Sequence, residues 1–153
     1  MGNKNDFEFI KRSPLFRGLS EKKLARLIQI AGVETYDPGK TIIFEGTSSD
    51  RLFFLLSGTV EIIKWTPEGK LRVLTTLEER GLFFGELAIV DVLPRSATVR
   101  AKTRVELLVF HRDKMVELFR SDREILVTLA LNVIRVLNQR IKELNESVAS
   151  LSV

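Results

Sequence analysis

Closely spaced turn signals break the middle of this chain into short runs, and they constrain its fold more than any other feature of the sequence. The signals are Asp37-Pro38-Gly39, Glu45-Gly46, Ser57-Gly58, Pro67-Glu68-Gly69 and Gly81. The runs between them are rich in β-branched and aromatic residues, which is typical of strands. The last run, 97–110, reads as one continuous alternation of apolar and polar residues. Strands separated by turns every ~8–12 residues predict an antiparallel sandwich or barrel, and the absence of long helices between them argues against a parallel α/β sheet.

Helical sequence lies on both sides of this β region. The N-terminal segment reads as helices, with Ser20 as an N-cap and Gly32 as the end of the second helix. After residue 111 there is no glycine or proline, so we expect Asp113 to cap a short helix and a long helix to begin after Ser121-Asp122. The prediction from spacing is a mainly β fold, a sandwich or barrel flanked by helices. Its single domain divides into residues 1–32, 33–111 and 112–153.

Composition excludes several kinds of chemistry. The chain has no cysteine and one histidine, His111, so disulfides, thiolate metal sites and histidine-based catalytic triads lack their residues. We therefore expect no enzyme activity and no cofactor. No apolar run is long enough to cross a membrane and the N-terminus lacks the apolar core of a signal peptide, so a cytoplasmic location is expected. The net charge of +4 is spread along the chain rather than gathered in a basic tail, which makes nucleic-acid binding an unfavoured alternative.

One segment, residues 84–99, combines the groups that bind a phosphate. Gly85 allows a close backbone approach, and the helical turn expected from Glu86 to Val90 would present free N–H groups to an anion. Arg95 supplies a planar fork of donors suited to phosphate oxygens. Glu86 is an unexpected neighbour for an anion unless the ligand also carries a hydroxyl group. Phosphate and hydroxyl together suggest a nucleotide, and the alternative is a structural connection in which Glu86 and Arg95 form an ion pair.

This segment resembles the phosphate-binding cassette of the cyclic nucleotide-binding domain family, which includes catabolite-activator-type regulators and regulatory subunits of cAMP-dependent protein kinase. The shared pattern is Phe-Gly-Glu-Leu-Ala, a six-residue gap that ends in Pro94, then Arg, a small residue, Ala and Thr-Val. The resemblance extends over about residues 14–145 and implies a mainly β fold, a jelly-roll-like β-roll flanked by N-terminal helices and a long C-terminal helix. The chain departs from many members at Asp91-Val92, where they carry a glycine, so the loop is expected to differ in shape.

The resemblance implies a role for each matched residue. Arg95 would pair with the cyclic phosphate, and Glu86 would accept a hydrogen bond from the ribose 2′-hydroxyl. Ser96 would bond to the phosphate or the base. Further cassette residues would complete the phosphate cradle, chiefly through their backbone: Gly85, Leu87, Ala88 and Ala97. The ligand would be cAMP, with cGMP as the alternative, because cGMP-selective members often carry threonine after the phosphate arginine.

The C-terminal helix carries two apolar stripes. The first has heptad spacing and comprises Val127, Ala130, Ile134, Leu137, Ile141, Leu144, Val148 and Leu151, here called the heptad stripe. The second comprises Leu126, Leu129, Val133 and Val136. We expect the second stripe to pack on the β body and the heptad stripe to meet a partner helix, most simply in a homodimer, with packing inside the monomer as the alternative. Ile141, Leu144 and Val148 should matter most for that contact without affecting the phosphate site. The resemblance also implies that this helix closes over the base of the nucleotide, and Arg140 is the expected lid residue.

These observations predict a non-catalytic sensor that binds a cyclic nucleotide and signals through its C-terminal helix to a dimer mate or another protein. A second reading is a scaffold of the same fold that binds no ligand, and a third is a nucleic-acid-binding protein.

Overall fold

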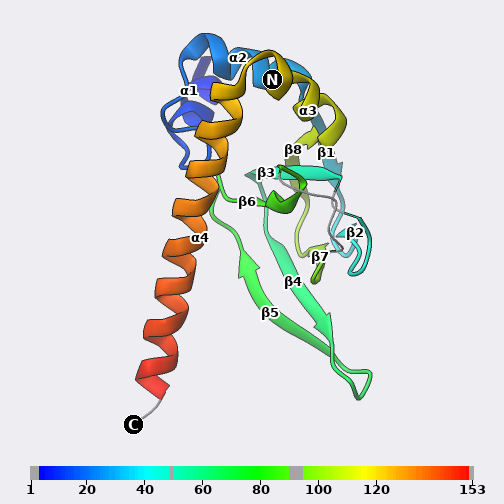
Figure 1. Cartoon of the computed structure of the whole chain (residues 1–153). Helices are drawn as coiled ribbons and strands as arrows, with labels where there is room; N and C mark the ends of the chain where they lie inside the picture. Colours follow the sequence, from blue (N-terminus) through cyan, green and yellow to red (C-terminus); the bar gives the residue numbers. More distant parts are fainter. Residues whose placement is uncertain (1–3, 49, 90–94, 152–153) are drawn as a thin grey trace.

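The computed structural model describes residues 4–48, 50–89 and 95–151 and consists of two antiparallel sheets with helices packed at one end (Figure 1). One sheet has the order β1-β8-β3-β6 and the other the order β2-β7-β4-β5. The strands are β1 (Gly32–Tyr36), β2 (Thr41–Ile43), β3 (Arg51–Ser57), β4 (Val60–Trp65), β5 (Leu71–Leu77), β6 (Phe83–Phe84), β7 (Thr98–Ala101) and β8 (Val105–His111). The turn spacing predicts the antiparallel β body, and the arrangement is the β-roll that the family resemblance implies.

The apolar residues on one side of the 97–110 alternation share one core, as their spacing predicts, but they lie on two strands. Val99 and Ala101 of β7 pack with Val105, Leu107 and Val109 of β8 in the cluster between the sheets. Between the strands, the N–H groups of residues 102 and 103 both donate to the Thr59 carbonyl and turn the chain. This break moves the chain from one sheet to the other. The single continuous strand that the alternation suggests is therefore wrong.

Strands β3 and β8 are buried on both faces, which explains their nearly continuous apolar sequence. Phe53 packs in the cluster between the sheets, while Phe54 faces the opposite way into a second cluster beneath the helices. The sheet that contains β3 therefore forms the middle layer of the molecule. Phe16, from the N-terminal segment, packs against both Phe54 and Phe110 with ring centroids 5.3 and 5.9 Å away.

In the described residues, four α-helices complete the fold: α1 (Lys4–Arg12), α2 (Glu21–Ile30), α3 (Arg112–Ser121) and α4 (Arg123–Leu151). Ser20 caps α2 as expected, and its Oγ accepts from the N–H of Lys23 at 3.2 Å. Two predicted boundaries are wrong. Ala31, in extended conformation, ends α2, so that Gly32 already begins β1. Residue 111 precedes α3 without a side-chain cap, and Asp113 lies inside the first turn of that helix.

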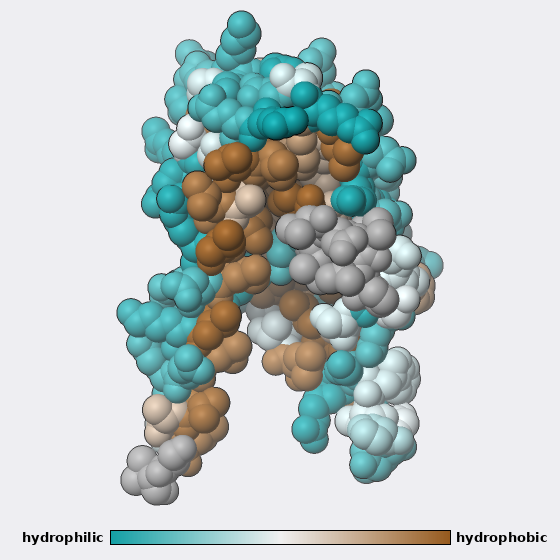
Figure 2. Space-filling view, viewed as in Figure 1, coloured by the Kyte–Doolittle hydropathy of each residue, from teal (hydrophilic) through white to brown (hydrophobic). Residues whose placement is uncertain are grey.

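Helix α4 changes its surroundings along its length. In its first half, Ile125, Leu129 and Val133 are buried in the cluster beneath the helices. From Ile141 onward every described side chain is exposed, and the helix extends away from the helical end of the molecule (Figure 1). Figure 2 shows an apolar strip along this extended part, beside a hollow that separates it from the β4–β5 hairpin. Within the described ranges, no helix combines the length and apolar character needed to cross a bilayer.

Candidate functional site

The cassette begins where β6 ends and forms a sharp turn into a short 3₁₀ helix, η1 (Glu86–Ile89). Gly85 makes the turn with a φ of +75°, a left-handed conformation that disfavours any side chain. At the other end of η1, Arg112 Nη1 donates to the Ala88 carbonyl at 3.1 Å, and the Arg112 N–H donates to the Asp50 carbonyl at 2.8 Å. The first residue of α3 thereby holds both η1 and the start of β3.

Arg95 is the buried cation of the site, with 7% of its surface exposed. Its backbone is fixed by two bonds: its N–H donates to the Thr47 carbonyl at 2.7 Å, and its carbonyl accepts from the Gly46 N–H at 2.8 Å. Its side chain donates from Nη2 to the Arg51 carbonyl at 2.7 Å. Burial lowers the pKa of Arg95, while the nearby carboxylates of residues 50 and 86 raise it. Because an arginine pKa starts far above neutrality, the guanidinium stays charged.

Gly85 and Arg95 are in direct contact. A Cβ added at Gly85 would lie 2.7 Å from Arg95 Nη1 and 2.8 Å from the Arg51 carbonyl oxygen. Both distances are shorter than real Cβ contacts, so the missing side chain is what lets the guanidinium lie against the turn. The structure therefore joins the glycine and the arginine of the cassette across nine intervening residues.

The other predicted cassette residues lie around this pair. The Glu86 side chain is half-buried and lines the same cavity as Arg95, and among the described groups no ion pair joins the two. Ser96 is exposed, and its carbonyl accepts from Lys64 Nζ at 3.3 Å. Ala97 is half-buried at the cavity wall.

The backbone of η1 is partly committed to its own turn. The Ala88 N–H donates to the Gly85 carbonyl at 3.1 Å, so its expected contribution to a phosphate cradle competes with that bond. Leu87 lies in η1 between them, and only its backbone is described. Residues 90–94, which include Asp91-Val92 and Pro94, lie outside the described residues.

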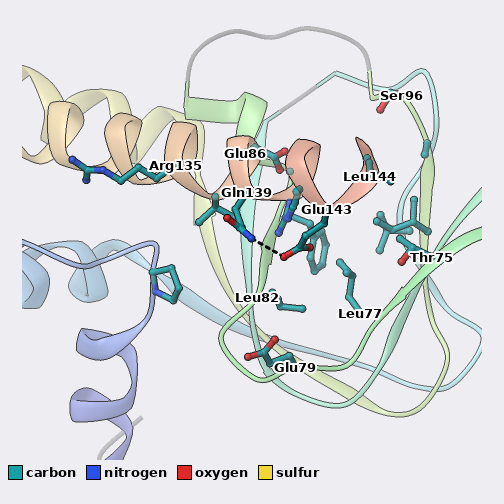
Figure 3. Close-up of a pocket in the computed structure, with 18 of the residues that line it drawn as sticks. Thr75, Leu77, Glu79, Leu82, Glu86, Ser96, Arg135, Gln139, Glu143 and Leu144 are labelled. Atoms are coloured by element: carbon teal, nitrogen blue, oxygen red, sulfur yellow. Dashed lines mark hydrogen bonds between the residues drawn. The ribbon is translucent and has the colours of Figure 1, made fainter. Parts of the chain in front are cut away.

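A cavity of about 910 Å³ opens beside the cassette, between the β-roll and α4 (Figure 3). Arg95 and Glu86 lie at the cassette wall, and Arg140, the expected lid, lies on the helix wall. Arg140 Nη2 donates to the Phe83 carbonyl at 3.2 Å, and its guanidinium carbon lies 5.3 Å from the centre of the Phe83 ring. This arginine links α4 to the strand that leads into the cassette.

The sequence alone did not identify most of the other residues that line the cavity. The apolar part comprises Ile43, Ile62, Leu77, Leu82, Phe84 and Val99, contributed by strands β2, β4, β5, β6 and β7 and by the loop that leads into β6. Alternation along each strand indicates one inward face, but which of these residues reach the cassette depends on the pairing of β7 with β2 and β4. No local motif marks them.

The position of Leu144 corrects the expectation that a change at this residue would affect the helix contact alone. Leu144 belongs to the heptad stripe and is 65% exposed, and it also lines the cavity with its neighbours Glu143 and Ser147 (Figure 3). A charge at residue 144 would therefore alter the cavity as well as the exposed stripe. Ile141 and Val148 are exposed and do not line the cavity.

Taken together, the cavity offers one buried, permanently charged guanidinium, one carboxylate beside it and an apolar wall opposite. A charged fork binds an oxyanion strongly where water is limited. A carboxylate accepts from a hydroxyl, and an apolar wall takes a planar ring. The described residues contain no group of three or more histidine and acidic side chains that could hold a metal ion.

Comparison with known proteins gives a family match: the model of the cyclic nucleotide-binding domain matches residues 33–122. A CRP-like cAMP-activated global transcriptional regulator of Mycobacterium tuberculosis is 30% identical over 144 residues, which cover 94% of this chain and 62% of the regulator. A cAMP-dependent protein kinase regulatory subunit of Aspergillus fumigatus is 37% identical over 105 residues, which cover 69% of this chain and 24% of the subunit. The chain thus spans less than two thirds of the length of these relatives.

Solved structures agree. The Thermus thermophilus catabolite activator protein has a TM-score of 0.74 at 30% identity, with 92% of this chain and 63% of that chain covered. The N-terminal domain of a transcriptional regulator from Streptomyces coelicolor has a TM-score of 0.75 at 28% identity, with 88% and 94% covered. The regulatory domain of Toxoplasma gondii PKA, crystallised with cAMP, has a TM-score of 0.67 at 27% identity, with 77% and 46% covered.

Proposed function

Because this chain belongs to the cyclic nucleotide-binding domain family, as a sensor domain related to CRP and to the regulatory subunits of PKA, we propose that it binds cAMP in the cavity beside η1 and signals through α4. Domains of this family are usually non-catalytic regulatory modules. In the proposal the chain works as one domain, with the 1–32 helices, the 33–111 β-roll and the 112–153 helices unfolding together.

The observation that carries the proposal is the buried Arg95 at the cavity wall, packed against Gly85. A desolvated guanidinium is costly unless it is matched, and its single described side-chain bond goes to a neutral carbonyl. The cyclic phosphate would supply the missing negative charge. Glu86 would accept from the ribose 2′-hydroxyl, and the apolar wall that includes Ile62 and Leu77 would pack against the ring system of the ligand.

Selectivity for cAMP over cGMP rests on two lines of support. Ser96 stands where cGMP-selective members of the family often carry threonine. The Mycobacterium relative is named as cAMP-activated, and the Toxoplasma structure contains cAMP. Competition between the two nucleotides for the same protein tests this part of the proposal, and a clear preference for cGMP would overturn it.

Titration calorimetry with cAMP, cGMP and a non-cyclic 5′-AMP control tests the function itself. We expect saturable 1:1 binding of the cyclic nucleotides that is lost in Arg95→Ala. An absence of heat with both cyclic nucleotides, confirmed by an unchanged melting temperature, would favour the ligand-free scaffold.

The proposed output is a homodimer formed by the heptad stripe. Ile134, Ile141 and Leu151 of this stripe are 61, 55 and 83% exposed, which leaves a long apolar surface along α4. The other face of the helix contributes Arg140 and Gln139 to the cavity. A ligand that moves α4 would change how two such helices meet, and sedimentation with and without cAMP would detect it.

A further inference from the structure

The cavity reaches well beyond the cassette. Its lining along α4 runs from Asn132 to Ser147, which at the rise of an α-helix is about 22 Å. The cassette residues occupy one part of this length. At the other end the wall is formed by Pro14 and Arg17, which follow α1, and by Asn132 and Arg135 of α4. Figure 3 shows Arg135 at the opposite end of the cavity from Ser96.

This far end is organised by one buried amide. Asn132 is 2% exposed, and its Nδ2 donates to the carbonyls of Leu15 and Arg17, both at 2.8 Å. Its Oδ1 accepts from Arg135 Nη1 at 3.1 Å. One side chain therefore ties the segment after α1 to α4 and fixes the direction of the Arg135 guanidinium. A pre-positioned donor loses less conformational entropy when a ligand binds.

The two arginines at this end lack acidic partners. Among the described residues, neither Arg17 nor Arg135 forms an ion pair, and the single side-chain bond of Arg135 goes to the neutral Asn132. Arg135 keeps further N–H donors free for a ligand. Glu79 also lines the cavity and has no ion pair in the described part of the chain, so its charge does not neutralise the arginines and opposes the binding of an anion in the cavity.

We propose that Arg17 and Arg135 form a second anion subsite, separate from the cassette, that binds a phosphate-class oxyanion. Two arginines that line the same end of the cavity, both with exposed side chains, suit the two charges of a phosphate better than the single charge of a carboxylate. The subsite shares a cavity with the proposed cAMP site but does not depend on it, because none of its residues belongs to the cassette.

Inorganic phosphate is the probe, followed by phosphorus NMR line broadening and by calorimetry on the full chain. To remove binding at the cassette, the titration is made in Arg95→Ala and, independently, in wild type saturated with cAMP. We expect saturable 1:1 binding in both, and about tenfold or more weaker binding after Arg135→Gln or Arg17→Gln. Arg72→Gln is the matched control, because Arg72 is exposed and lies outside the cavity. Glu79→Gln should strengthen phosphate binding.

The result that overturns the subsite is phosphate binding that does not saturate, or that Arg72→Gln weakens as much as Arg135→Gln does. Acetate in place of phosphate tests the ligand class, and equal or tighter acetate binding would overturn the assignment to phosphate. Because cAMP binding is measured on the same variants, loss of phosphate binding with cAMP affinity unchanged distinguishes this subsite from the proposed function. If Arg95→Ala does not fold, the wild-type titration alone decides.

Discussion

Gly85→Ala tests whether the contact between the cassette turn and Arg95 is what the site depends on. The alanine would have to adopt a φ of +75°. Its methyl group would lie 2.7 Å from Arg95 Nη1 and 2.8 Å from the Arg51 carbonyl oxygen. The left-handed conformation alone costs alanine about 1–2 kcal/mol. The guanidinium can swing aside, but this breaks its 2.7 Å bond to Arg51, and a bond to a charged group contributes about 1.5–3 kcal/mol.

The free energy of unfolding should therefore fall by about 2.5–5 kcal/mol, and the affinity for cAMP should fall with the displaced arginine. Gly69→Ala is the matched control, because Gly69 has a φ of +78° but nothing within 4 Å of an added Cβ. It should cost only the backbone term of about 1–2 kcal/mol and leave ligand affinity unchanged. Urea unfolding and calorimetry on both variants give the two differences. Equal losses of stability in the two variants, with cAMP affinity retained in Gly85→Ala, would refute the reasoning.

Three further predictions concern the proposed ligand and the proposed dimer. Arg95→Ala should weaken cAMP binding by several kcal/mol and Arg95→Lys should recover only part, because an ammonium lacks the planar fork; calorimetry checks both, and wild-type affinity in Arg95→Ala would remove the arginine from the site. Wild type should bind the 2′-deoxy analogue of cAMP at least about tenfold more weakly than cAMP, and Glu86→Gln should reduce this difference in affinity. Equal binding of the two ligands by wild type would exclude the Glu86 contact. Ile141→Asp should shift the protein toward monomer in sedimentation, because an unpaired charge buried in the dimer contact is costly. It should leave the cAMP affinity unchanged, because residue 141 lies outside the cavity. A wild type that is monomeric at high concentration would contradict the dimer.

The parts of the fold that local sequence determines could be predicted. The turns at Gly39, Gly46, Gly58 and Gly69 all have positive φ, which their glycines make accessible. The cassette could be located because its groups lie within sixteen consecutive residues. The two faces of the first half of α4 follow from its apolar spacing, and Leu129 is buried while Val127 is exposed.

The parts that depend on tertiary contacts could not be predicted. The end of α2 is set by a tertiary contact, because Gly32 pairs with Val109 of β8 and so enters the sheet directly. The apolar cavity wall depends on how β4 and β5 lie relative to the cassette. The role of Asn132 was also missed, because a lone polar residue within an apolar helix gives no sign of carbonyl partners that lie 115 and 117 residues earlier in the chain.

The double position of Leu144, on the cavity wall and on the heptad stripe, has a thermodynamic consequence. A side chain that contacts both a nucleotide and a neighbouring helix couples the two equilibria, and such coupling is reciprocal. If cAMP tightens the association of two α4 helices, association must tighten cAMP binding by the same factor. The measured affinity for cAMP would then rise with protein concentration, and titrations at two concentrations would report the coupling free energy directly.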